Sequence, residues 1–177
     1  DKIDRLRLLA IERKADERPG YFRLSDFHEG AYDRHDHVSP WSLSAHNADA
    51  QLLILLQDWS SSDVLSRDID REAVEKGYTP SLRTNVNLID LVRQHFGLNI
   101  SETYVTNLFV FIKPGGISAR IPMSDMEYCA ERYAIPQIRI VCPPVALCVG
   151  LQTLNAVRLA LGESPVRAAA AANEPLK

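Results

Sequence analysis

Three stretches of the chain have the hydrophobic pattern of β-strands. Leu52 to Leu56 is an unbroken apolar run bounded by polar residues, which is typical of a strand buried on both faces. Residues 103–112, "TYVTNLFVFI", are rich in β-branched and aromatic residues, and Lys113-Pro114-Gly115-Gly116 ends them. Residues 143–150, "PPVALCVG", predict a third buried strand.

Helical periodicity separates these strands. Residues 1–18 predict a first helix with Ile3, Leu6, Leu9 and Ile11 near one side, ended by Pro19-Gly20. Ser81 is the expected cap of a helix over 82–97, whose Leu88, Leu91, Val92 and Phe96 share one face. Residues 123–141 predict a helix that Pro136 interrupts, and 151–162 predict one with Leu151, Leu154, Val157 and Leu161 inward.

Alternating strands and helices indicate an α/β fold. We expect one domain over 1–177, with helices on both faces of a central, mostly parallel sheet of about four strands, a three-layer α/β/α arrangement. Ligands bind beyond the carboxyl ends of such strands, so Asp58 and residues 113–116 are expected at the same, functional edge. Residues 19–50 lack a period and predict a long connection packed over the domain. The alanine-rich end without a further strand suggests C-terminal truncation.

Composition narrows the class of protein. The chain has 177 residues, 46% of them apolar, which is enough for a substantial core. It lacks a long apolar run and a signal-like start, so we expect a cytoplasmic protein that makes no membrane contact. The net charge of −3 argues against delocalised nucleic-acid binding but permits a local basic groove, and Lys113 and Arg120 could meet phosphate at the strand edge.

Cofactors are not expected. Cys129, Cys142 and Cys148 lack the spacing of a zinc site or a disulfide framework and are interpreted as buried free thiols. A histidine-rich stretch within 28–46 is interpreted as a solvated loop. We therefore predict no metal and no other cofactor.

Four motifs stand in a suggestive order: "LLQDWSS" at 55–61, "GYTPSLRTNVNLIDLV" at 77–92, "VTNLFVFIKPGG" at 105–116 and "PPVALCVGLQTLNAV" at 143–157. Together they resemble the uracil-DNA glycosylase superfamily over roughly 50–160. The resemblance implies a base-excision repair enzyme that hydrolyses the N-glycosidic bond of uracil or a related damaged base in DNA, without a cofactor.

The resemblance also implies roles for individual residues. Asp58 would act on water and on the sugar cation, and Asn107 would hydrogen-bond the edge of the flipped base. Gln57 and Trp59 would also line the base site, although Tyr78 is an alternative aromatic platform. Ser81, in the Pro-Ser-Leu element at a helix start, would contact DNA phosphate. Such roles suit the chemistry, because glycosidic cleavage builds positive charge on the sugar and negative charge on the base.

Departures from the family pattern keep other readings open. Ser60 stands where the family has the tyrosine that excludes thymine, and the late His-Pro-Ser motif has no counterpart before Lys177. The alternative is a non-catalytic protein of this fold that binds a nucleobase or nucleic acid. A third is an unrelated flavodoxin-like protein. Asp58 can also be a turn residue, Asn107 a structural hydrogen-bonding residue and Trp59 part of the core.

Overall fold

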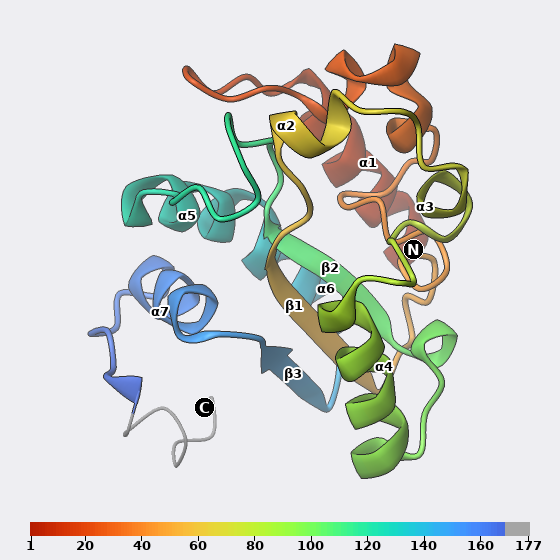
Figure 1. Ribbon diagram of the computed structural model, residues 1–177. Coiled ribbons are helices and arrows are strands. Elements are labelled where there is room, and N and C mark those ends of the chain that lie inside the picture. Colours follow the sequence, from red (N-terminus) through yellow and green to blue (C-terminus); the bar gives the residue numbers. More distant parts are fainter. Residues whose placement is uncertain (169–177) are drawn as a thin grey trace.

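A parallel β-sheet lies at the centre of the molecule (Figure 1). The computed structural model describes residues 1–168. Its strands are β1 (Leu52–Asp58), β2 (Tyr104–Phe109) and β3 (Val145–Cys148), and they lie in the order β2-β1-β3. Both partners of β1 run parallel to it. The predicted mixed α/β fold with a parallel sheet flanked by helices is confirmed, with three strands in the described part where about four were expected.

Seven α-helices connect and flank the strands within the described part of the chain. They are α1 (Lys2–Ala15), α2 (Ser62–Leu65), α3 (Arg71–Lys76), α4 (Arg83–Phe96), α5 (Met123–Cys129), α6 (Ile135–Val141) and α7 (Leu151–Ala160). Short 3-10 turns cover Leu24–Asp26, His28–Asp33 and Ile100–Glu102. The predicted helices over 1–18, 82–97 and 151–162 correspond to α1, α4 and α7, whereas α2 and α3 lie in a segment for which no helix was predicted.

Pro136 interrupts the helix of residues 123–141, as predicted. A π-helical turn, Ala130–Ala134, separates α5 from α6, and Pro136 lies in the first turn of α6. Proline lacks the N–H that a continuous α-helix needs, and a widened turn just before it accommodates that loss.

The central strand is buried on both sides. Leu52, Leu53, Ile54 and Leu55 are at most 1% exposed. Leu53 and Leu55 belong to the core cluster that includes residues of α1, α5, α6 and α7, while Leu52 and Ile54 pack with Leu88 and Val92 of α4. Burial of each such side chain contributes about 1.5 to 3 kcal/mol, so β1 is a rigid support for the residues at its end.

The buried faces of α4, β3, α7 and α1 differ from the prediction. In α4, Leu88 and Val92 are buried as expected, but Leu91 and Phe96 are 51% and 45% exposed. β3 is half open, because Ala146 and Cys148 pack against the core while Val145 and Leu147 are 45% and 37% exposed. In α7 the buried residues are Thr153, Ala156 and Val157, whereas Leu151 and Leu161 are exposed. Both elements carry apolar residues on more than one side, so local periodicity does not decide which side is covered.

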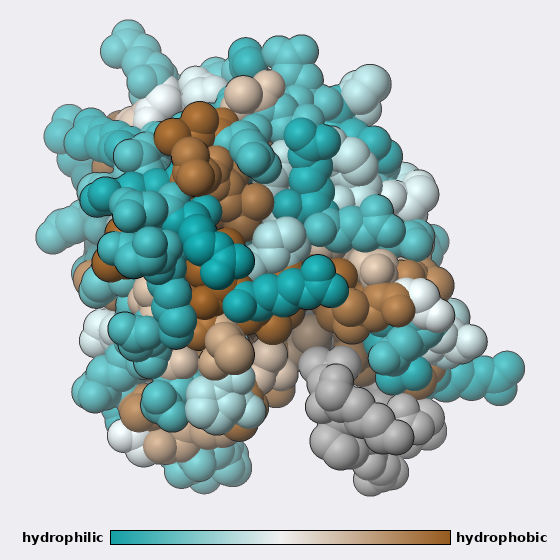
Figure 2. All heavy atoms as spheres, turned by 180° about the vertical axis from the view of Figure 1, so that it is seen from behind, coloured by the Kyte–Doolittle hydropathy of each residue, from teal (hydrophilic) through white to brown (hydrophobic). Residues whose placement is uncertain are grey.

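The first helix is also apolar on two sides. Leu6 and Leu9 are buried as expected, but Ile3 and Ile11, expected beside them, are 48% and 54% exposed. α1 is drawn behind the other elements in Figure 1, and the view from behind shows apolar atoms gathered within a mostly hydrophilic surface (Figure 2).

An ion pair fixes the long connection of residues 19–50 to α1. The Arg13 guanidinium donates to both carboxylate oxygens of Asp33, over 2.8 and 2.6 Å, and also to the carbonyl oxygen of His37. The side chains of Arg13 and Asp33 are 3% and 5% exposed. Beyond them, Val38 and Trp41 are buried in the core clusters, so the connection packs against the rest of the domain as predicted.

Gly77 holds the next part of this connection. It ends α3 in the left-handed conformation, with φ of 81°. A Cβ atom at this position would overlap the carbonyl oxygen of Pro40 and the backbone nitrogen of Ser42. A glycine is therefore required for the close approach of residues 40–42 to the turn after α3.

Removing one member of the buried Arg13–Asp33 pair should destabilise the protein strongly. Asp33→Ala leaves a buried guanidinium without its carboxylate, and we expect the free energy of unfolding to fall by about 3 to 5 kcal/mol in urea denaturation. Glu72→Ala, which removes the exposed i,i+4 partner of Lys76, should cost less than about 1 kcal/mol. Equal losses in the two variants would contradict this assignment.

Candidate functional site

Two polar residues lie on the neighbouring strands β1 and β2 near the carboxyl edge of the sheet. Asp58 is the last residue of β1 and pairs in register with Phe109, while Asn107 pairs with Leu56. The two polar residues are thus on neighbouring strands, offset by two positions, or roughly 7 Å along the strand direction.

Asp58 forms a buried ion pair with Lys113. The Lys113 Nζ lies 2.8 Å from Asp58 Oδ2, and the side chains are 4% and 11% exposed. Lys113 also donates to the carbonyl oxygen of Ile117. The predicted proximity of Asp58 and residues 113–116 is confirmed, but Lys113 is not an exposed basic residue: its charge is buried against the carboxylate.

Backbone contacts hold the two segments of this pair together. Ser61 and Lys113 form a parallel bridge, and the backbone N–H of Ser62 donates to the carbonyl oxygen of Lys113 over 2.9 Å. The N–H of Gly115 in turn donates to the Ser62 hydroxyl. The polar stretch after β1 therefore continues the pairing of the sheet edge with the loop after β2.

Asn107 is a buried amide with one side satisfied. It is 1% exposed, and its Oδ1 accepts a hydrogen bond of 2.6 Å from the hydroxyl of Ser39. Its Nδ2 has no hydrogen-bond partner among residues 1–168. A buried donor without a partner costs about 1 to 3 kcal/mol, so this N–H₂ group is a position where an acceptor would be stabilised.

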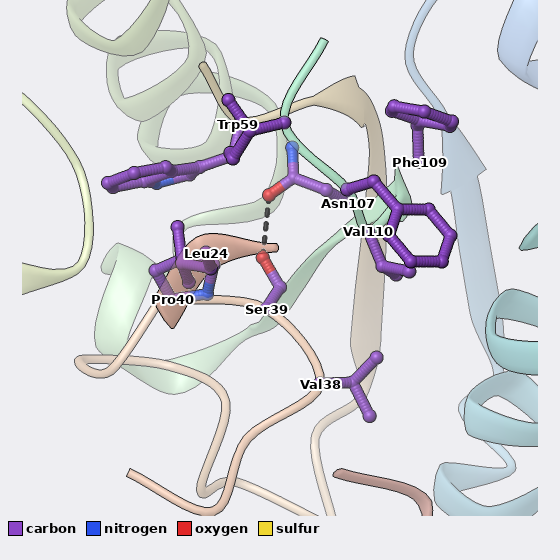
Figure 3. A pocket seen from close by; sticks show the side chains of 10 residues that line it. Leu24, Val38, Ser39, Pro40, Trp59, Asn107, Phe109 and Val110 are labelled. Carbon is purple, nitrogen blue, oxygen red and sulfur yellow. Dashed lines mark hydrogen bonds between the residues drawn. The ribbon is translucent and has the colours of Figure 1, made fainter. Parts of the chain in front are cut away.

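The same amide lines a small cavity (Figure 3). The cavity measures about 10 Å³, the space of roughly one water molecule. Its wall is made by Leu24, Val38, Ser39, Pro40, Trp59, Asn107, Phe109, Val110, Phe111 and Ile112. Residues 38–40 of the long connection thus cover the site rather than pack on its back. Asp58 and Lys113 are not among the lining residues.

Of the two candidate aromatic platforms, Trp59 lines the cavity. Its indole N–H donates to the carbonyl oxygen of Gly77 over 2.8 Å, and its ring lies against Tyr32 with centroids 5.2 Å apart. Tyr78 instead stacks on Trp41, with centroids 4.6 Å apart and planes 15° from parallel. One face of the Tyr78 ring is therefore used within the core.

The other predicted site residues do not line the cavity. Gln57 is half-buried in β1, and Ser60 is buried directly after Trp59. Ser81 is exposed and lies just before α4, but the N-cap of that helix is Leu82, without a side-chain hydrogen bond. The predicted cap at Ser81 is therefore wrong. Ser81 has no helix-capping role that would compete with a phosphate contact.

Two of the three cysteines are buried or half-buried, and the third is exposed. Burial raises the pKa of the Cys129 thiol to about 12 and that of Cys148 to about 11, so both stay protonated at neutral pH. Cys142 is exposed, contrary to the expectation of three buried thiols. In the described part of the chain, no three His, Cys, Asp or Glu side chains come together as metal ligands would.

Comparisons with known proteins assign no family to the chain. No protein-family model matches the chain, and no curated protein matches its sequence. Within residues 1–168, no helix has the length and apolar character needed to cross a membrane.

Ser39 and buried Lys113 are the site features that the sequence did not reveal. Lys113 directly follows the apolar run of residues 108–112, which is a signal that a lysine there could be partly enclosed. Ser39 lies in a segment without periodicity, 68 positions from Asn107. No local pattern predicts such a contact.

Breaking the ion pair at the sheet edge should leave Asp58 as a buried, unpaired carboxylate. Lys113→Met should lower the free energy of unfolding by about 3 to 5 kcal/mol in urea denaturation. The double variant Asp58→Asn/Lys113→Met should lose less than the sum of the two single variants, because the groups interact directly. Lys14→Met, at an exposed pair with Asp36, serves as the control. Strict additivity would argue against the pair.

His37 should make the stability of the protein sensitive to acid. Burial, with the neighbouring charges of His35 and His46, lowers the pKa of His37 from its ordinary 6.5 to about 4. The unfolded chain then binds more protons than the folded one between these values, so stability falls as pH drops from about 6.5 towards 4. We expect a smaller loss between pH 7 and pH 5 in His37→Gln than in the wild type, measured by urea denaturation.

The exposed His95 on α4 offers the matched control for this titration. His95→Gln should keep the wild-type loss between the two pH values. The same loss in His37→Gln as in the wild type would exclude His37 as its source.

Proposed function

We propose that the protein is a nucleobase-recognising hydrolase of the uracil-DNA glycosylase type, acting on uracil or a related damaged base in DNA. The observation that carries this proposal is the buried Asn107 amide, with its unpaired Nδ2 donor, beside the strand that ends in Asp58. An orphan donor in an aromatic-lined cavity favours a planar ligand that carries a carbonyl acceptor.

Base recognition follows from the amide. Nδ2 of Asn107 donates to O4 of uracil, and the second lone pair of Oδ1 accepts from N3–H. Cytosine offers the opposite pattern, an amine and a bare ring nitrogen, and pairs poorly with this orientation. Trp59 supplies an aromatic surface for a base taken out of the stack.

Asp58 supplies the charge that the reaction needs. A carboxylate beside the sugar stabilises the cation that develops as the glycosidic bond breaks, and it orients the attacking water. Lys113 contacts Oδ2, so we assign Oδ1 to the water. As the bond between the sugar C1′ and the base nitrogen breaks, the water oxygen bonds to C1′, and the proton that this water loses to Asp58 passes through solvent to the anionic base.

The proposal requires the cavity to open. A volume of about 10 Å³ admits one water, not a base. Leu24 of the long connection also lines the cavity, and its outward displacement, with Ser39 held against Asn107, would widen the space beside the amide. Ser81, exposed before α4, is the residue we assign to DNA phosphate. With this function we also propose a three-layer α/β/α arrangement whose central sheet has a fourth strand.

A second candidate is supported by the Asp58–Lys113 pair itself. A buried ammonium 2.8 Å from the carboxylate offsets its charge and weakens its attraction for a sugar cation. With Ser60 in the position of the family's tyrosine, the same pocket would serve a protein that binds a nucleobase or nucleic acid without hydrolysis.

The enzyme proposal is tested with a fluorescently labelled oligonucleotide carrying one deoxyuridine, single- or double-stranded. The wild type should convert the deoxyuridine to an alkali-labile abasic site, visible as strand cleavage on a gel. Asp58→Asn should lower that rate about 100-fold or more, because a neutral amide neither stabilises the cation nor accepts a proton. Asp63→Asn, an exposed carboxylate in the same segment, should leave it unchanged.

The outcomes separate the two candidates. Affinity for the deoxyuridine oligonucleotide without base release, unchanged in Asp58→Ala, supports the binding protein and excludes the enzyme. The absence of both cleavage and binding, with the single-stranded and with the double-stranded oligonucleotide, overturns both candidates.

A further inference from the structure

We propose that Ser39 is a positioning residue that fixes the orientation of the Asn107 amide and thereby sets which base edge the cavity accepts. This inference rests on the proposed function and adds the residue that determines specificity. Ser39 belongs to the long connection of residues 19–50, here called the covering segment, and not to the sheet. It is 3% exposed.

A side-chain amide has two orientations of nearly equal shape that exchange its donor and its acceptor. In the structure, the Ser39 hydroxyl donates to Asn107 Oδ1 over 2.6 Å. Figure 3 shows the Asn107 nitrogen directed away from Ser39 and towards Trp59. The free donor thus belongs to a side chain that lines the cavity together with Trp59.

Counting unpaired groups explains why this orientation is favoured. As observed, Nδ2 is the buried side-chain group of this pair without a partner in residues 1–168. After a flip, Nδ2 could donate to the Ser39 oxygen, but the Ser39 hydroxyl hydrogen and Asn107 Oδ1 would then both lack partners. Burying one more unpaired group disfavours the flipped state.

The position of the hydroxyl is itself fixed by its neighbours. Val38, on one side, is 3% exposed and belongs to the core cluster. Pro40, on the other, has its carbonyl oxygen against Gly77, where a Cβ would overlap it. Arg13 holds the carbonyl oxygen of His37. Ser39 therefore approaches Asn107 from a backbone that is held before and after it.

The two orientations favour different ligands. The observed one presents a donor that matches O4 of uracil, whereas the flipped one presents an acceptor that matches the amino group of cytosine. Without the hydroxyl, both orientations leave the same groups unpaired. Ser39→Ala should therefore remove the bias rather than only weaken the fold.

The first test measures affinity for two single-stranded oligonucleotides that differ in one nucleotide, deoxyuridine or deoxycytidine. Measurements are made in an Asp58→Asn background so that no base is released. The preference for deoxyuridine should fall about tenfold in Ser39→Ala, the effect of one lost discriminating hydrogen bond. An unchanged preference would overturn the inference.

Ser44→Ala is the matched control. Ser44 is a buried serine of the same segment, 0% exposed, whose hydroxyl bonds to the backbone of Trp41 and Val105 rather than to Asn107. Its loss should leave the preference for deoxyuridine unchanged. An equal fall in the two variants would show that a loosened segment, and not the amide orientation, sets the preference.

The second test reads the amide directly by NMR. With Ser39 present, the side-chain N–H₂ group of Asn107 should give one pair of proton signals, and with Ser39→Ala it should give two pairs or shifted averages. A wild type that shows no preference for deoxyuridine overturns the proposed base recognition. The NMR result then stands alone for Ser39: an unchanged pair of Asn107 signals in Ser39→Ala overturns its positioning role.

Discussion

A buried amide in a parallel strand must find partners, and the hydrogen bond between Ser39 and Asn107 meets that requirement for one of its two ends. The strand around Asn107 is buried along its length, so bulk water does not reach the side chain. The partner has to come from another segment. The ion pair of Arg13 and the close contact at Gly77 hold the covering connection where it can supply that partner.

The fold was predictable where local pattern determines structure. The apolar run Leu52 to Leu56 and the β-rich residues 103–112 predicted β1 and β2, and the helical pattern of residues 82–97 predicted α4. α2 and α3 were missed because helices of four and six residues are too short to show a period. The open face of β3 was missed because its burial depends on which neighbours cover it, and the strand itself does not encode them.

The candidate site was also predictable only in part. The position of Asp58 next to the loop after β2 follows from the rule that parallel strands end at one edge. The burial of Lys113 and the contact from Ser39 do not, because both depend on packing between segments far apart in the chain. Trp59, read as either core or platform, turned out to take part in the core and in the cavity wall at once.

The small size of the cavity has a consequence for the measured affinity of a ligand. If a ligand can enter only when Leu24 moves away, its measured affinity is the affinity of the open form multiplied by the fraction of molecules that are open. An open fraction of about 1% would weaken binding about 100-fold relative to the open form. A substitution far from the ligand, at Asp33, would then tune affinity through that fraction, without changing any contact that the ligand makes.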